Sequence, residues 1–132
     1  MKKHDSTTKP KSGNLTIKFQ NGSELSLDIK YYLYSGRGTI IIAQSDNDNH
    51  FAFCTPDGLG LPGSGHYNVA YPNAAPGEYR LKWFLQHNGI LKEVKSATMG
   101  FSSKDFRHEI DGNIAGVFDD NTSFTAKFTY TK

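Results

Sequence analysis

The sequence contains one cysteine, no long apolar run and little excess charge. Cys54 is alone among 132 residues, which excludes an internal disulfide and a multi-cysteine metal cage. No stretch approaches the ~20 apolar residues of a membrane-spanning helix, and the first residues carry no hydrophobic signal segment. Lys and Arg number 15 and Asp and Glu 13, so the net charge of +2 predicts no nucleic-acid partner.

The composition is nevertheless that of a chain that folds. Aromatic residues make up 13% and apolar residues 36%, more than a disordered chain leaves in water. Residues 1–13 lack periodic apolar positions, so we expect a flexible leader and then a single domain over residues 14–132. A native Met start predicts a cytoplasmic protein, and prior removal of a leader sequence predicts a secreted one. The composition predicts no particular oligomeric state.

Apolar and polar residues alternate from residue 14 onward. Leu15, Ile17 and Phe19 come before Asn21-Gly22, and apolar residues at alternate positions follow. A period of two is typical of a strand with one solvated face. Asn-Gly favours a type I′ turn, because both of its residues tolerate positive φ. The sequence therefore predicts a β-hairpin over residues 14–35.

Similar runs continue to the end of the chain, and no window has helical periodicity. We expect turns at the polar stretch 45–50, at Asn88-Gly89, at Asp111-Gly112 and at residues 119–122. Trp83 is expected at the centre of the core. The strands predicted between these turns are residues 39–43, 51–54, 79–86, 90–101, 106–110, 114–118 and 124–130.

Many short strands with regular turns indicate an all-β fold. We expect a two-layer antiparallel β-sandwich, immunoglobulin-like or jelly-roll-like, with a small β-barrel as the alternative. Pro76-Gly77-Glu78-Tyr79-Arg80-Leu81 leading into Trp83 resembles the late strands of immunoglobulin-like and fibronectin-like domains over about eight residues. The resemblance implies a tyrosine that bonds to the adjoining corner. With no paired cysteine, an antibody-type domain is excluded.

Residues 55–77 interrupt the strand pattern with proline and glycine, apart from a short strand near 66–71. Long loops within compact domains are often functional, so this segment is predicted to be a binding loop; an ordinary connection between two sheets is the alternative. Its candidate ligand-binding residues are Asp57, His66, Tyr67, Asn68 and Tyr71.

The second candidate region is the turn at residues 45–50. Asp46, Asp48 and His50 are expected to contribute to ligand binding from this turn. Two carboxylates near two asparagines could also suit calcium, but such clusters are common in tight turns, and we predict neither a metal nor a cofactor. Cys54 with His50 or His66 is the catalytic alternative, although a cysteine ending an apolar strand is commonly a small buried side chain.

These observations favour a non-enzymatic, lectin-like binding module with carbohydrate as the first ligand class. Tyr and Asn in irregular segments suit stacking on sugar rings and hydrogen bonding to hydroxyls. Tyr32 and Tyr34 fall on the face opposite Tyr31, where they would form an aromatic platform if solvent reaches them or pack inside if a second layer covers them. A protein-interaction subunit, such as an immunity protein or inhibitor, is the second hypothesis. A lipid-binding or membrane-acting β protein is the third.

Overall fold

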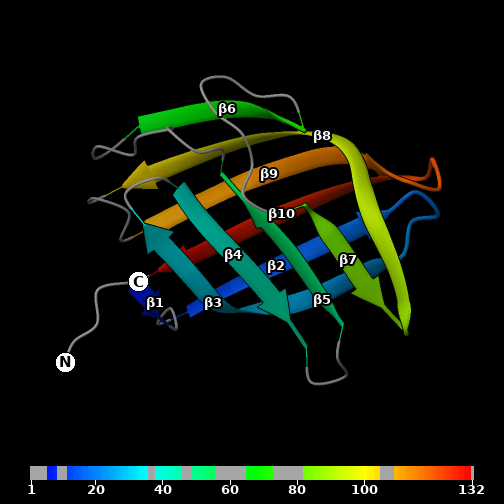
Figure 1. Ribbon diagram of the computed structural model, residues 1–132, viewed down its shortest axis with the longest axis horizontal. Coiled ribbons are helices and arrows are strands. Elements are labelled where there is room, and N and C mark those ends of the chain that lie inside the picture. The colour runs from blue at the N-terminus through cyan, green and yellow to red at the C-terminus, as the bar shows by residue number, and fades with distance from the viewer. Residues whose placement is uncertain are drawn as a thin grey trace.

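The computed structural model describes residues 6–8, 12–35, 38–45, 49–55, 65–72, 82–104 and 109–131. These ranges contain ten antiparallel β-strands and no helix, which confirms the all-β prediction (Figure 1). The strands are β1 (Ser6–Thr8), β2 (Ser12–Phe19), β3 (Glu24–Ser35), β4 (Gly38–Gln44), β5 (His50–Cys54), β6 (Gly65–Tyr71), β7 (Phe84–His87), β8 (Ile90–Lys104), β9 (Glu109–Phe118) and β10 (Ser123–Thr131).

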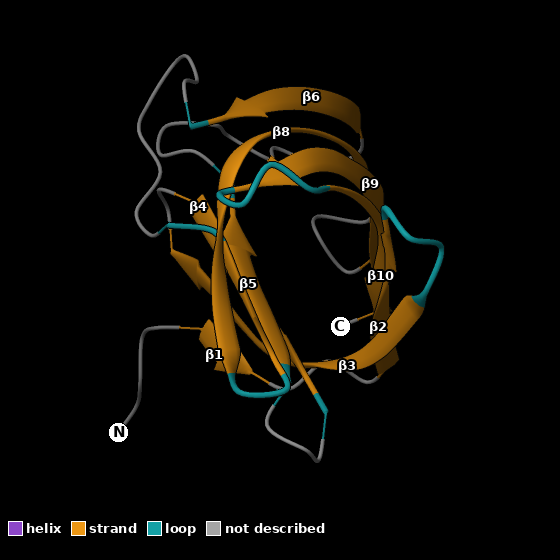
Figure 2. Ribbon diagram, turned by 90° about the vertical axis from the view of Figure 1, so that its right-hand side faces the viewer, coloured by secondary structure: helices purple, strands orange, loops and turns teal. Residues whose placement is uncertain are grey.

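The sheet closes into a barrel of eight strands. Hydrogen-bonded neighbours follow the order β3-β2-β10-β9-β8-β7-β5-β4, and β4 pairs back onto β3 from Asp28↔Gln44 to Ser35↔Gly38. Figure 2 looks into this barrel and shows its strands around a common interior. The two remaining strands pair at its rims, β6 with β8 and β1 with β3.

The predicted two-layer sandwich is therefore not the architecture, and the small-barrel alternative is. Buried and exposed side chains alternate along each strand in both folds, so this pattern does not distinguish them. The two folds differ in how the long strands pair with their neighbours. β3 has a bulge between Ile29 and Tyr31; its first part pairs with β2 and its second part with β4. A bulge bends a strand and increases its twist, which lets one strand complete the ring. Residues 76–81, which carry the immunoglobulin-like resemblance, lie outside the described residues.

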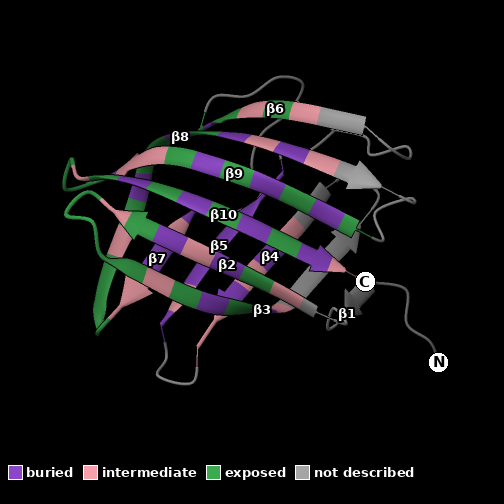
Figure 3. Ribbon diagram, turned by 180° about the vertical axis from the view of Figure 1, so that it is seen from behind, coloured by how far each residue is buried: buried purple, intermediate pink, exposed green. Residues whose placement is uncertain are grey.

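The barrel interior is packed with aromatic side chains. Trp83 is fully buried, as predicted, and its ring centre lies 5.8 Å from that of Phe53. Buried and exposed residues alternate along β9 and β10 (Figure 3), and the predicted apolar face of β10 is buried throughout. A cavity among Ile41, Phe53 and Phe128 has a volume of about 10 Å³, too small for an organic ligand.

The turn predicted at Asp111-Gly112 does not form. Both residues lie inside β9, with Gly112 opposite Phe101 on one side and Phe128 on the other. A Cβ atom at Gly112 would lie 2.7 Å from Phe101 Cβ and 2.7 Å from Phe128 Cζ. The glycine is needed for close packing of three strands, which explains why a common turn dipeptide is found in a strand interior.

The predicted hairpin over residues 14–35 forms with a different turn. Gly22 N–H donates to Phe19 O and Phe19 N–H to Ser23 O, and of the two central residues only Gly22 has positive φ, at 91°. This is a three-residue loop that ends in a glycine bulge. At Asn88-Gly89 both residues have positive φ, 53° and 80°, as a two-residue type I′ turn requires.

The boundaries expected for a leader and a single domain remain predictions. Within the predicted leader, residues 6–8 pair with β3 and β2 already begins at Ser12. Residues 1–5 and 9–11 lie outside the described residues.

Where the structure describes the chain, it has no helix with the length and apolar character that crossing a membrane requires.

Candidate functional site

Two hairpin turns with the same construction lie side by side at the end of the barrel shown on the right of Figure 1. In the β2–β3 turn, Asn21 Oδ1 accepts the Ser23 N–H at 2.9 Å and the Ser23 hydroxyl at 2.7 Å. In the β9–β10 turn, Asp120 Oδ1 accepts the Thr122 N–H at 3.0 Å and the Thr122 hydroxyl at 2.6 Å. Each turn thus satisfies its own backbone through an Asn or Asp side chain.

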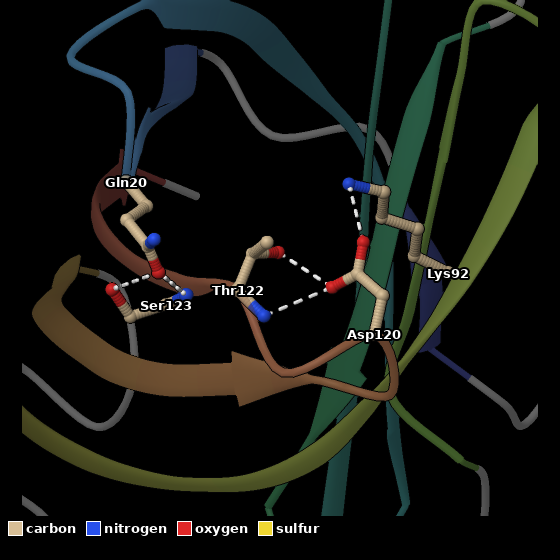
Figure 4. A network of polar contacts seen from close by, with 5 residues as sticks. All are labelled: Gln20, Lys92, Asp120, Thr122 and Ser123. Atoms are coloured by element: carbon tan, nitrogen blue, oxygen red, sulfur yellow. Dashed lines mark hydrogen bonds and ion pairs between the residues drawn. The ribbon is translucent and has the colours of Figure 1, made fainter.

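A side chain from the first turn ties it to the second. Gln20 Oε1 accepts the backbone N–H of Ser123 at 2.9 Å and the Ser123 hydroxyl at 3.3 Å (Figure 4). Phe19 and Phe118, which open the two turns, have ring centres 6.5 Å apart. The two turns are 103 residues apart in sequence at the Gln20–Ser123 bond and are brought together by the pairing of β2 with β10.

The β7–β8 hairpin supplies a third side of this region. The His87 ring lies on the Phe19 ring with centres 5.4 Å apart and planes only 6° from parallel. His87 is held next to the type I′ turn, where Asn49 Oδ1 accepts the backbone N–H of Asn88 at 2.9 Å. The stacked rings form a wall with a half-exposed imidazole at its edge.

Lys92, also from the β7–β8 hairpin, provides the positive charge. Its Nζ lies 3.1 Å from Asp120 Oδ2 and 5.4 Å from the centre of the Phe118 ring. The hydroxyl and backbone hydrogen bonds from Thr122, followed by the one from Lys92, lower the pKa of Asp120 from 3.8 to about 2. Asp120 is therefore a fixed anion, and Lys92 is oriented by it.

These side chains enclose a pocket of about 300 Å³, which we name the turn pocket. Small-molecule sites in proteins begin at about this size. In Figure 4 Thr122 stands between Gln20 and Lys92. The lining residues are Phe19, Gln20, Asn21 and Ser23 from the first turn, with His87, Lys92 and Thr122 opposite.

The described residues among those predicted in the 55–77 segment do not line the turn pocket. Tyr67 and Tyr71 lie on one face of β6; Tyr67 is half-buried and stacks on Phe101 with ring centres 5.4 Å apart. Asn68 is exposed on the other face, and His66 lies opposite Ser102 in the β6–β8 pair. Asp57 is outside the described residues, as are residues 56–64 and 73–81.

Tyr71 is a core residue. It is only 7% exposed, stacks on Trp83 with ring centres 4.5 Å apart, and its hydroxyl oxygen accepts the backbone N–H of Trp83 at 3.0 Å. Burial raises the pKa of Tyr71, while the hydrogen bond to Trp83 acts in the opposite direction. These contacts give Tyr71 a role in stabilising the fold.

The second predicted region is described only at its ends. Asp46 and Asp48 lie outside the described residues, whereas His50 begins β5 and packs its ring edge-on against Phe84 at 5.3 Å. Cys54 is fully buried at the other end of β5, four positions away, or about 13 Å along a strand. Cys54 and His50 therefore do not form a catalytic pair in this conformation.

The described residues contain no cluster of three or more His, Cys, Asp or Glu side chains that could hold a metal ion.

Sequence reasoning identified neither Gln20 nor Lys92 as a site residue and gave His87 only a turn position. One signal was available: Asn21-Gly22-Ser23 and Asp120-Asn121-Thr122 have a similar order of residue types, and in each case a Phe lies two positions before the Asn or Asp. That similarity predicts two similar turns. Their contact depends on strand pairing, which the sequence did not reveal.

Comparison with protein-family models, with curated proteins and with solved structures finds no significant match for this chain.

Proposed function

We propose that this protein is a non-enzymatic binding protein whose ligand is a carbohydrate, held in the turn pocket. The observation that carries the proposal is the stacked pair of Phe19 and His87 beside the polar side chains of two rigid turns. Carbohydrate sites commonly combine a ring face, which contacts the apolar side of a sugar, with amides and charges that bind its oxygens.

The rigidity of the pocket supports this proposal. The two turns are held by internal hydrogen bonds, and Gln20 connects them through Ser123. A site whose side chains are already held in place loses less conformational entropy when a ligand binds. The volume of about 300 Å³ suits one or two sugar rings.

The experiment compares His87→Ala with His50→Ala on a glycan array, followed by calorimetry with the glycans that bind. Both histidines are half-buried and pack on a phenylalanine ring, but only His87 lines the turn pocket, whereas His50 belongs to the turn at 45–50. Loss of a contacting ring is expected to weaken binding about tenfold, or ~1.4 kcal/mol. We expect that loss in His87→Ala and unchanged binding in His50→Ala.

Other results would relocate or reject the site. Loss in His50→Ala alone would favour the 45–50 turn, and loss in Tyr67→Ala alone would favour the 55–77 segment. An array with no bound glycan would reject the carbohydrate function. Thermal unfolding of each variant separates loss of binding from loss of fold.

A protein-interaction role is the second candidate, because Ile90 is 61% and Leu91 is 57% exposed at the tip of the β7–β8 hairpin. These two neighbouring side chains offer exposed apolar area to a protein partner. Ile90→Ser with Leu91→Ser should abolish capture of such a partner and leave glycan binding unchanged. Glycan binding lost in this variant would place the tip in the sugar site instead.

A further inference from the structure

We infer that the turn pocket selects a sugar that carries an oxyanion, a carboxylate or a sulfate, over the same sugar with a neutral hydroxymethyl group. This inference rests on the proposed carbohydrate function and adds its ligand class. It follows from which atoms of the lining residues are already bonded within the protein and which are not.

The amide oxygens of the pocket are already used. Asn21 Oδ1 accepts two hydrogen bonds from Ser23, and Gln20 Oε1 accepts two from Ser123. In each pair one donor is a backbone N–H, which can only donate, so the accepting atom of each amide must be its oxygen. Asp120 is likewise bonded by Thr122 and Lys92.

The donor groups of the same side chains remain available. The Gln20 and Asn21 amide nitrogens have no hydrogen-bond partner among the described residues. An ammonium group has three N–H donors, and the Lys92 Nζ uses one of them on Asp120 in the described structure. The pocket therefore offers two amide donors and a partly occupied ammonium group.

A ligand group that only accepts hydrogen bonds matches this arrangement best. A neutral hydroxyl can also accept from these donors, but it carries no charge, and its own hydrogen finds both amide oxygens already occupied. A carboxylate or sulfate ester accepts from several donors at once, and hydrogen bonds to a charged group are about twice as strong as neutral ones. Asp120 opposes an incoming anion, but it lies at the surface, where water and salt screen that repulsion, and its charge is paired with Lys92.

The test uses three glycosides that differ only at carbon 6: methyl β-D-glucuronide, methyl β-D-glucoside 6-sulfate and methyl β-D-glucoside. Dissociation constants are measured by NMR titration of the full chain, following the side-chain NH₂ signals of Gln20 and Asn21. We expect one or both charged glycosides to bind about tenfold more tightly than the neutral one, and this advantage to shrink as salt is added. The comparison of the two charged glycosides identifies the oxyanion.

Lys92→Gln and Lys95→Gln form the matched pair of variants. Both lysines lie on β8 and contact the β9–β10 turn, Lys92 through Asp120 and Lys95 through Asn121 Oδ1 at 3.1 Å, but only Lys92 lines the pocket. Lys92→Gln should remove the tenfold preference for the charged glycosides over the neutral one. Lys95→Gln should keep the preference.

The outcomes separate this inference from the proposed function. If the neutral glycoside binds at these signals as tightly as the charged ones, the inference fails and the carbohydrate function stands. Equal effects of the two lysine variants would also overturn it, because general charge attraction would then explain the preference. If none of the three glycosides shifts these signals, both the inference and the turn pocket as a sugar site are rejected.

Discussion

Replacing Gly112 by alanine should lower the free energy of unfolding by about 3 kcal/mol, the upper end of the cost of overpacking a core. The new Cβ would lie 2.6 Å from Gly100 O, 2.7 Å from Phe101 Cβ and 2.7 Å from Phe128 Cζ. Phe128 can turn its ring tip away. The other two atoms belong to, or are fixed directly on, the backbone of β8, so β8 and β9 must move apart.

The assay is urea unfolding followed by the fluorescence of the only tryptophan, Trp83, which is fully buried. Gly22→Ala is the control, because a Cβ there has nothing within 4 Å and only the φ of 91° is strained, for a cost of about 1 kcal/mol. If the free energy of unfolding of Gly112→Ala lies within ~0.5 kcal/mol of that of the unaltered protein, β9 does not pack against β8 and β10 as described, and the account of the closed barrel fails.

Three further predictions concern single hydrogen bonds and their pH dependence. Tyr71→Phe removes the acceptor of the buried backbone N–H of Trp83 and should cost about 1–2 kcal/mol in the same urea assay. Burial raises the pKa of Tyr71 above 10.0, so the contribution of Tyr71 to stability is complete below pH 10.0 and is lost as the pH rises through the folded-state pKa. The free energy of unfolding should therefore fall less steeply at alkaline pH in Tyr71→Phe than in the unaltered protein. Parallel curves of unfolding free energy against pH would contradict this. The Asp120 carboxyl carbon should titrate by NMR near pH 2, so the stabilisation of the turn by ionised Asp120 is present above pH 3.8 and is lost as the pH falls through about 2. In Thr122→Val the titration midpoint should move toward 3.8. An unchanged midpoint would contradict the assignment of the lowered pKa to the Thr122 hydroxyl.

The candidate site was less accessible to prediction than the fold. The residues predicted from composition, such as Tyr67 and Asn68, lie on β6, on opposite faces of one strand. Composition marks a segment as unusual, but it does not say which of its side chains meet. Gln20 and Thr122 line one pocket because β2 and β10 are neighbours, and no local pattern records that pairing.

The sequence by itself determined most of the strands, because alternation is a local property: a side chain two positions along a strand returns to the same face. It also determined that Asn88-Gly89 is a turn and that Phe128 faces inward. Only the tertiary structure decided that the sheet closes and that Gly112 belongs to a strand. Both depend on which distant strands become neighbours. The sheet closes because the bulge in β3 directs the second half of that strand to β4. Residue 112 must be a glycine because the Phe101 and Phe128 side chains occupy the space where its Cβ would lie.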